Sequence, residues 1–193
     1  MTWFLQNDKV DERWAWMQTF SKEECNAIIE LVNMEKLQKA ELGPGIEDEN
    51  VRITEVFWLR TDKENREKYE WIYRRCTDAV QKMNEQFFNY NLTYIETMQF
   101  TVYDKKGSFY GKHIDAEYSG FGHRKLSFSV QLTEEESYEG GSLWLFNSKD
   151  PDVAPKDIGT MTIFPSWTLH EVTPLKKGKR YSLVGWVNGP RFK

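Results

Sequence analysis

Seven consecutive residues near the middle of the sequence alternate strictly between apolar and polar side chains. The run reads Leu-Ser-Phe-Ser-Val-Gln-Leu from position 126 to position 132. Successive side chains of a β-strand point to opposite faces of the sheet, so the run predicts a strand with one apolar and one polar face. The apolar face has to pack against a core, whereas the polar face looks into a polar space. This strand therefore restricts the chain to a layered or closed β-architecture.

The rest of the second half of the chain also has the pattern of β-strands. From about residue 92 onward, strand-like runs alternate with segments rich in Gly, Asp, Asn and Lys, which favour turns. The turn segments are 104–108, 118–122, 139–141, 147–150 and 176–178. The aromatic content of 15% suits a β-rich core, because aromatic side chains pack well on a pleated surface.

The first half is mixed. Residues 13–20 and 50–60 have strand-like composition. Ser21 and Glu24 have the spacing of a capping box, which predicts a helix that continues to near Gly43. The pair Thr61-Asp62 is expected to cap a second helix, whose apolar stripe from position 69 to position 87 indicates core packing.

These patterns predict one mainly β domain with packed helices, a half-open barrel or jelly roll with helices on its outside. All 193 residues fit a single domain, with helical support at about 21–90 and the β core at about 92–187.

The composition excludes several classes of protein. With 26 basic and 30 acidic residues, the chain lacks the basic surplus of a nucleic-acid-binding protein. No run approaches the length of a membrane-spanning helix, and residues 1–20 lack the apolar segment of a secretory signal. Cys25 and Cys76 form neither a CxxC pair nor a disulfide framework, so we expect a reducing, cytoplasmic location.

His113 and Asp115 stand two residues apart at the end of an expected strand, where they would share one face. His170 follows the expected strand at 159–165. Two imidazoles and one carboxylate on one side of an ion leave other coordination positions open, which is the facial triad of non-haem Fe(II) oxygenases. A surface histidine near an aspartate is common, so the His-x-Asp pair alone does not define a site.

Arg180 is the residue that favours a metal site over a chance pair of surface residues. It lies on the next expected strand, 180–187. A lone strand arginine is usually a surface group, but in a cavity-forming fold its guanidinium can pair a carboxylate through two hydrogen bonds. His123, in the expected loop at 118–123, fits no ligand spacing, and we interpret it as a surface or loop residue.

The chain resembles the prolyl 4-hydroxylase-type branch of the Fe(II)/2-oxoglutarate oxygenases, from about Ser21 to Trp186 and most densely from Met98 onward. The matching blocks stand in order at family spacing: Gln99–Tyr103, Tyr110–Asp115, Arg124–Ser127, Tyr138–Leu143, Phe164–Ser166, His170–Val172 and Gly178–Val184 with Trp186. The resemblance implies a double-stranded β-helix (jelly-roll, cupin-like) core with helices packed on one sheet.

The resemblance also implies a set of roles. His113, Asp115 and His170 would be the iron ligands, Arg180 would pair the distal carboxylate of 2-oxoglutarate, and the Tyr103 hydroxyl would support that carboxylate. The implied cofactors are Fe(II), 2-oxoglutarate and O2, with ascorbate as reductant. The implied reaction is a dioxygenase hydroxylation of a C–H bond that releases succinate and CO2.

Three further matches concern the substrate. In prolyl 4-hydroxylases the positions of Tyr110, Arg124 and Trp186 border the pocket of the proline ring, which implies a peptidyl proline in a peptide or protein. Gln131 departs from the pattern, because some relatives place an aromatic hydroxyl there near the cosubstrate. Two alternatives stay open: the same cofactors acting on a free amino acid, lipid or other small metabolite, and a cupin-like metal-binding module without catalysis.

Overall fold

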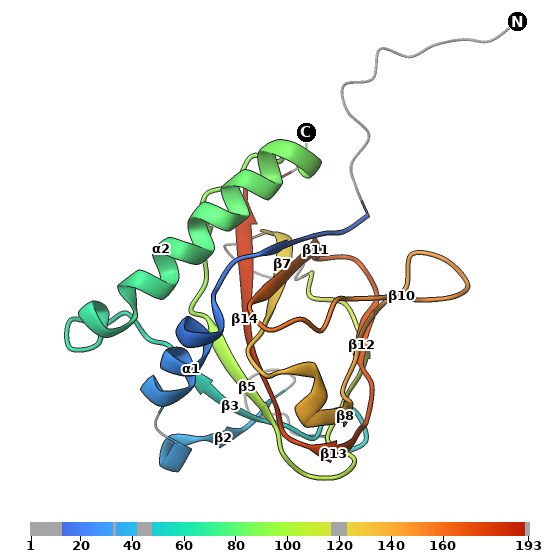
Figure 1. Cartoon of the computed structure of the whole chain (residues 1–193). Coiled ribbons are helices and arrows are strands. Elements are labelled where there is room, and N and C mark those ends of the chain that lie inside the picture. The colour runs from blue at the N-terminus through green and yellow to red at the C-terminus, as the bar shows by residue number, and fades with distance from the viewer. Residues whose placement is uncertain (1–12, 33, 42–47, 117–122, 192–193) are drawn as a thin grey trace, which may run out of the picture.

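The computed structural model describes residues 13–32, 34–41, 48–116 and 123–191. Two helices, α1 (Lys22–Leu31) and α2 (Arg66–Met83), lie on one side of a large antiparallel sheet (Figure 1). A single π-helical turn, η2 (Asn84–Phe88), extends α2. Short 3-10 turns, η1 and η3, occupy Met34–Lys36 and Glu135–Ser137.

The large sheet has the strand order β1-β11-β7-β14-β5-β3-β2, and β4 pairs with β14 beside this path. Its strands are β1 (Ala15–Gln18), β2 (Gln38–Lys39), β3 (Glu55–Trp58), β4 (Tyr94–Ile95), β5 (Gln99–Tyr103), β7 (His123–Gln131), β11 (Thr160–Pro165) and β14 (Arg180–Gly189). The long strand β14 lies between β5 and β7, so it is the centre of this sheet.

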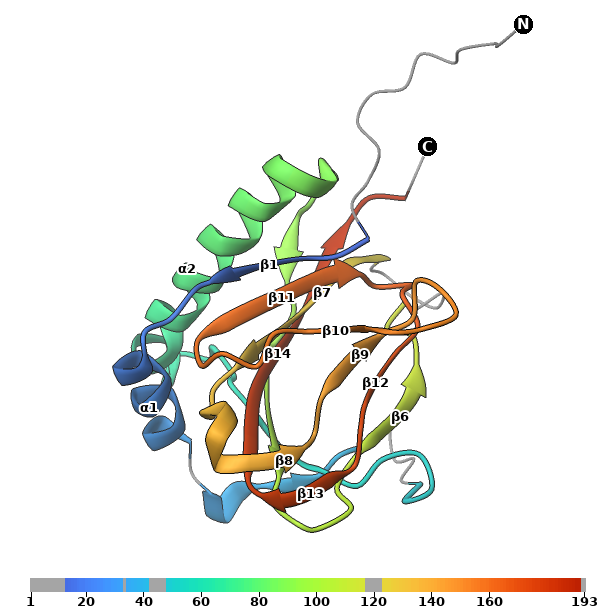
Figure 2. The ribbon, with the colours of Figure 1, turned by 45° about the vertical axis from the view of Figure 1, so that its right-hand side comes forward.

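A smaller sheet faces the large one on the side away from the helices (Figure 2). Its order is β10-β9-β12-β6, formed by β6 (Tyr110–His113), β9 (Leu143–Leu145), β10 (Asp152–Val153) and β12 (His170–Val172). The pair β8 (Tyr138–Gly140) and β13 (Leu175–Gly178) forms a separate ribbon. Two antiparallel sheets stacked in this way form a double-stranded β-helix, or jelly roll, and the predicted fold class is confirmed.

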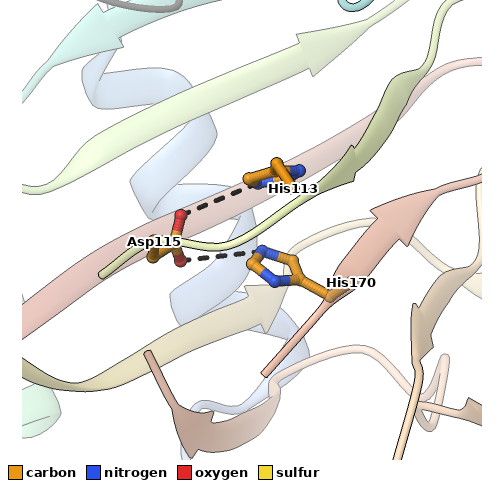
Figure 3. A group of neighbouring side chains, drawn as sticks. All are labelled: His113, Asp115 and His170. Carbon is orange, nitrogen blue, oxygen red and sulfur yellow. Dashed lines mark ion pairs between the residues drawn. The ribbon is translucent and has the colours of Figure 1, made fainter. Parts of the chain in front are cut away.

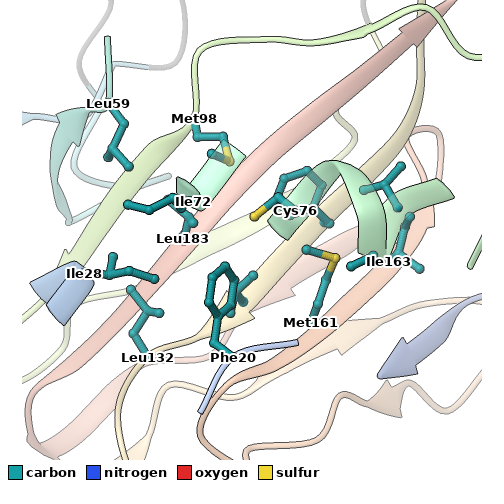
Figure 4. Packing of buried hydrophobic residues seen from close by; sticks show 14 of the residues in the cluster. Phe20, Ile28, Leu59, Ile72, Cys76, Met98, Leu132, Met161, Ile163 and Leu183 are labelled. Carbon is teal, nitrogen blue, oxygen red and sulfur yellow. The ribbon is translucent and has the colours of Figure 1, made fainter. Parts of the chain in front are cut away.

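The main core fills the space between the helices and the large sheet. Ile28 of α1, Ile72 and Cys76 of α2, and Leu183 of β14 are fully buried in one cluster (Figure 4). The alternation predicted for residues 126–132 is confirmed, because its four apolar side chains join this cluster and Ser129 borders a cavity on the opposite face. The large sheet thus has a dry face toward the helices and a polar face toward the small sheet.

Helix starts and ends differ in part from the predictions. The capping box is present: the Ser21 hydroxyl accepts from the Glu24 N–H, and the Glu24 carboxylate accepts from the Ser21 N–H. The prediction that this helix reaches Gly43 was wrong, because α1 ends at Leu31 and Val32 is extended. The Thr61-Asp62 cap was also wrong: α2 begins at Arg66, and Asp62 closes a turn by accepting from the Asn65 N–H.

Two further predictions need qualification. The strand expected at 50–60 is confined to β3, and the residues before it form a turn. The segment 118–122, predicted as a loop, lies outside the described residues. Among the helices that the structure describes, none is long and apolar enough to cross a membrane.

Candidate metal centre

A cavity of about 500 Å³ lies between the polar face of the large sheet and the small sheet. Both sheets contribute to its lining: β5 and β14 provide Tyr103, Arg180 and Trp186, whereas β6 and β12 provide Tyr110, His113 and His170. Asp115 and Arg124 complete the set of sequence-predicted site residues around this cavity. All eight residues therefore border one space, although they come from distant parts of the chain.

His113, Asp115 and His170 line this cavity and their side chains point toward one another (Figure 3). The two histidines are direct partners in the β6–β12 ladder, where His113 ends β6 and His170 begins β12. Asp115 lies just beyond β6, and its backbone N–H donates to the Ser166 carbonyl at 2.9 Å. The Nε2 atoms of His113 and His170 each lie 3.6 Å from a different carboxylate oxygen of Asp115.

Both imidazole rings are fixed by the backbone. Nδ1 of His113 lies 2.7 Å from the Gly111 carbonyl, and Nδ1 of His170 lies 2.9 Å from the Thr168 carbonyl. A carbonyl oxygen only accepts, so each Nδ1 carries the proton and each Nε2 keeps a free lone pair directed at the centre. Burial, and next the neighbouring His170, lower the pKa of His113 to about 4, which keeps this ring in its neutral, metal-binding form.

This donor set fits a divalent metal ion. Ligand atoms about 2.1 Å from an octahedral ion, at right angles to one another, are about 3 Å apart. The three candidate ligand atoms lie within 4.8 Å of one another, so small side-chain adjustments would bring them onto one ion. Imidazole nitrogen and carboxylate oxygen are donors that Fe(II) accepts, and they occupy one side only of the centre.

Arg180 also lines the cavity and is 3% exposed. It is paired with Tyr103 across the β14–β5 ladder, and its guanidinium carbon lies 5.1 Å from the centroid of the Tyr103 ring. Its Nε donates to the side-chain oxygen of Gln131 at 3.1 Å, and Gln131 donates in turn to the Tyr138 hydroxyl at 3.0 Å. Gln131, which departs from the family pattern, thus orients the guanidinium.

One nitrogen of Arg180, Nη1, is buried and has no hydrogen-bond partner among the described residues. A buried cationic donor without an acceptor is costly, so such a group marks the position of an absent partner. Since the donor is a guanidinium that borders the cavity, its natural partner is a carboxylate. Arg180 and its neighbours therefore fit a carboxylate-bearing molecule that also reaches the metal centre.

Tyr110, Arg124 and Trp186 lie around the metal centre itself. The Tyr110 ring stacks on His113 with a centroid distance of 3.5 Å. The Arg124 guanidinium lies 4.4 Å from the Trp186 ring centroid and donates to the Asp115 carbonyl at 3.2 Å. The indole N–H of Trp186 is buried without a partner among the described residues, although the ring borders the cavity.

Two charged residues of this region were missed by the sequence analysis. Glu96 accepts from two nitrogens of Arg124, at 2.8 and 2.7 Å, and neutralises it. Arg52 is 8% exposed, borders the cavity and lies over the Tyr110 ring. Neither residue has a distinctive spacing in the sequence, because each reaches the site through tertiary packing.

His123 lies apart from the metal centre. It begins β7, so its assignment to a loop was wrong, and its Nε2 accepts from the Nε of Arg191 at 3.0 Å. Its side chain is not part of the cavity lining.

Comparisons with known proteins agree with this geometry. Residues 98–188 match the model of the 2OG-Fe(II) oxygenase superfamily. A PKHD-type hydroxylase of Synechococcus sp. (strain CC9605) is 44% identical over 82 residues, 42% of this chain and 37% of that protein. A PKHD-type hydroxylase of Prochlorococcus marinus (strain MIT 9215) is 31% identical over 119 residues, 60% of this chain and 54% of that protein. The matched region thus spans about half or less of these curated relatives.

Solved structures share the fold at low identity. A prolyl hydroxylase from Trichoplax adhaerens, in complex with a hypoxia inducible factor peptide fragment, superposes with a TM-score of 0.75 at 19% identity, covering 92% of this chain and 84% of that one. A Pseudomonas putida prolyl-4-hydroxylase gives a TM-score of 0.71 at 22% identity, covering 93% and 94%. At these identities the likeness establishes the shared jelly roll.

Proposed function

We propose, from the premise that this chain belongs to the 2OG-Fe(II) oxygenase superfamily, that it is an Fe(II)- and 2-oxoglutarate-dependent dioxygenase that hydroxylates a peptidyl proline. The observation that carries the proposal is the unpaired Nη1 of Arg180, a residue that lines the same cavity as His113, His170 and Asp115. A metal site and a carboxylate site in the wall of one cavity suit a cosubstrate that binds to both.

In this proposal His113, Asp115 and His170 hold the iron, and Arg180 holds the distal carboxylate of 2-oxoglutarate with help from the Tyr103 hydroxyl. When bound, Fe(II) with 2-oxoglutarate and O2 supplies the oxidising chemistry, with release of succinate and CO2. The chain itself supplies orientation and shelter from water. Gln131 fixes the guanidinium plane, and the sheets enclose the cavity on two sides.

The prolyl part of the proposal rests on Tyr110, Arg124 and Trp186. An aromatic ring offers a flat apolar wall to a pyrrolidine, and both Tyr110 and Trp186 border the cavity. The unpaired indole N–H of Trp186 could donate to a peptide carbonyl of the substrate. Relatives named as hydroxylases and fold neighbours that include prolyl hydroxylases support this substrate class.

Three finer points belong to the same proposal. The chain would act as one oxygenase domain, in which the helices support the large sheet and the jelly roll carries the site. Two separate buried thiols suit a reducing, cytoplasmic location. Ascorbate would serve as the reductant that keeps the iron in its Fe(II) state.

The test incubates the protein with Fe(II), 2-oxoglutarate, ascorbate and O2, and measures succinate. A library of proline-containing peptides, with matched Pro→Ala peptides and free proline, is then analysed by mass spectrometry for the gain of one oxygen atom. We expect succinate formation and oxygen gain only in proline-containing peptides. Succinate without oxygen in any proline peptide, together with an oxidised small metabolite, would replace the peptide by the alternative substrate class.

A further inference from the structure

Arg52 is a buried cation in the wall of the cavity that the roles above leave unused. It lies between β2 and β3, and its backbone bridges to Tyr110 at the start of β6. Its side chain is more than nine-tenths buried and borders both the cavity and a smaller hollow near Thr54 and Asp104. Such deep burial of a permanent charge needs a compensating contact.

Two contacts fix the guanidinium in place. Its Nε donates to the Thr54 hydroxyl at 2.7 Å, and its central carbon lies 4.3 Å from the centroid of the Tyr110 ring. The same Tyr110 ring stacks on His113, with a centroid distance of 3.5 Å. The Tyr110 ring therefore contacts both Arg52 and a candidate metal ligand, so the Arg52 charge lies close to the metal centre.

The two terminal nitrogens of Arg52 have no hydrogen-bond partner within the described part of the chain, and no described carboxylate lies within 4.0 Å of them. The contrast with Arg124 is direct, since Glu96 neutralises that guanidinium through two short hydrogen bonds. Glu41, another carboxylate of the cavity wall, is exposed to solvent, whereas Arg52 is buried.

The difference between Arg52 and Arg124 becomes clearer when the charges of the loaded site, which holds iron and 2-oxoglutarate, are added up. A divalent iron beside Asp115 leaves one positive charge, and Arg180 adds a second. The two carboxylates of 2-oxoglutarate would cancel both, and Arg124 is paired with Glu96. Arg52 and the solvent-exposed Glu41 are the charges that remain on the described cavity wall, and Arg52 is the buried one of the two, so a substrate anion can pair with it away from bulk water.

We propose that Arg52 binds a carboxylate of the substrate that belongs to the hydroxylated residue or to its neighbour in the chain. This inference rests on the proposed function and narrows its substrate class. The same chemistry has two sources: an acidic side chain next to the target proline, or the free C-terminal carboxylate of a chain that ends in proline, for which free proline is the smallest binding probe. A guanidinium with two free terminal nitrogens can pair either one through two parallel hydrogen bonds.

The test compares acids with their neutral amides. The probes are three pairs: a blocked Ala-Ala-Pro-Asp-Ala peptide and its Asn counterpart, an Ala-Ala-Pro peptide with a free and an amidated C-terminus, and proline with prolinamide. Calorimetry measures their dissociation constants on protein that holds Zn(II) and 2-oxoglutarate, because zinc does not change its redox state and turnover is prevented. The same pairs are then given to the iron-loaded enzyme, and oxygen gain is measured by mass spectrometry.

The proteins compared are wild type, Arg52→Gln, Arg52→Lys and the matched control Arg66→Gln, whose side chain is 70% exposed. In at least one pair we expect the acid to bind the wild type and the control about tenfold more tightly than the amide. The difference should vanish in Arg52→Gln and shrink in Arg52→Lys, which keeps the charge but loses the planar pair of donors. The responding pair identifies the source of the carboxylate.

The inference is overturned if no pair distinguishes acid from amide, if no probe binds, or if the difference persists in Arg52→Gln. Should Arg52→Gln fail to fold, an undiminished difference in Arg52→Lys overturns it instead. Failure of the proposed function is separate: acid preference without oxygen gain in any proline probe removes the prolyl substrate and leaves Arg52 as the carboxylate site. Oxygen gain in a proline probe without acid preference keeps the prolyl substrate and removes Arg52 as the carboxylate site.

Discussion

At the scale of single residues, the metal centre depends on backbone contacts as much as on its three side chains. The carbonyls of Gly111 and Thr168 accept from the two Nδ1 atoms, so both Nε2 atoms are available before any ion binds. Prior orientation of this kind lowers the entropic cost of binding a metal. The ligand roles are therefore testable by metal content alone, without a known substrate.

We expect His170→Ala to lower the stoichiometry of bound Fe(II) or Mn(II) to near zero, because two ligands seldom hold such ions. His123→Ala is the matched control: it also removes a histidine, but from a position outside the cavity lining. Metal content after gel filtration is measured by elemental analysis. Loss of metal in His123→Ala, or full metal content in His170→Ala, would refute the assignment.

Arg180→Ala is expected to weaken 2-oxoglutarate binding by well over tenfold while metal content stays near that of wild type. Removing one partner of a buried, hydrogen-bonded charge pair costs about 2–5 kcal/mol. Tyr103→Phe should act in the same direction with a smaller effect. Arg74→Ala, at a side chain that is 77% exposed, is the control, and calorimetric titration with 2-oxoglutarate is the measurement. An unchanged affinity in Arg180→Ala would mean that another group binds the cosubstrate.

The two cysteines should be unreactive in the folded protein. Both are fully buried, and burial raises the pKa of the Cys25 thiol from its ordinary 9.0 to about 12. Cys25 ionises near pH 9 in the unfolded chain and only near pH 12 in the folded one, so its contribution to stability falls as pH rises above about 9. Urea unfolding at pH 7.5 and pH 10 should show a smaller loss in Cys25→Ala than in wild type. An identical loss in both would exclude this linkage.

The site residues differ in how far the sequence could reveal them. His113, Asp115, His170 and Arg180 stand in short motifs, so spacing and resemblance identified them as candidates. Glu96 and Arg52 act on those residues from other segments, and their positions follow from how the sheet brings the segments together. Tertiary contacts of this kind leave no local pattern in a single sequence.

At the scale of elements, α2 holds the large sheet through one buried face. Ile72 is 0% exposed and belongs to the core cluster that also contains Leu183 of β14. Ile72→Ala is expected to reduce the free energy of unfolding by about 2–5 kcal/mol, since it removes buried methylene groups and leaves a cavity. Glu67→Ala, on the exposed side of the first turn, is the control. Urea unfolding followed by tryptophan fluorescence would show whether the two variants differ in this way.

The predictions of strands and helices were most accurate where one face of the element is buried, because burial then fixes the spacing of its apolar side chains. The alternation at 126–132 and the helical stripe from Tyr69 to Met83 are confirmed, because each faces the same core. The predicted end of α1, near Gly43, lies about twelve residues beyond Leu31, and the start of α2 was placed a few residues too early. The true ends depend on where the chain leaves the sheet and on turn contacts such as that of Asp62 with Asn65, which compete with local helix signals.

At the scale of the whole molecule, the candidate site joins the two sheets of the jelly roll. His113 and His170 belong to β6 and β12 of the small sheet, whereas Arg180 belongs to β14 at the centre of the large sheet. A cosubstrate held by both the metal and Arg180 would cross from one sheet to the other. Its binding free energy would then oppose separation of the sheets, and so unfolding of the whole domain.

Ligand binding should therefore raise the melting temperature in two steps. A ligand present at one hundred times its dissociation constant adds about 2.7 kcal/mol to stability, which for a chain of this size corresponds to a rise of about 5–10 °C. Zn(II) alone should stabilise wild type, and 2-oxoglutarate should add a second rise that requires the metal. Asp115→Ala should lose both rises, whereas Arg180→Ala should keep the first and lose the second. Differential scanning calorimetry of chelator-treated protein provides the baseline, and a rise with 2-oxoglutarate that persists in Arg180→Ala would show that the cosubstrate does not bridge the sheets.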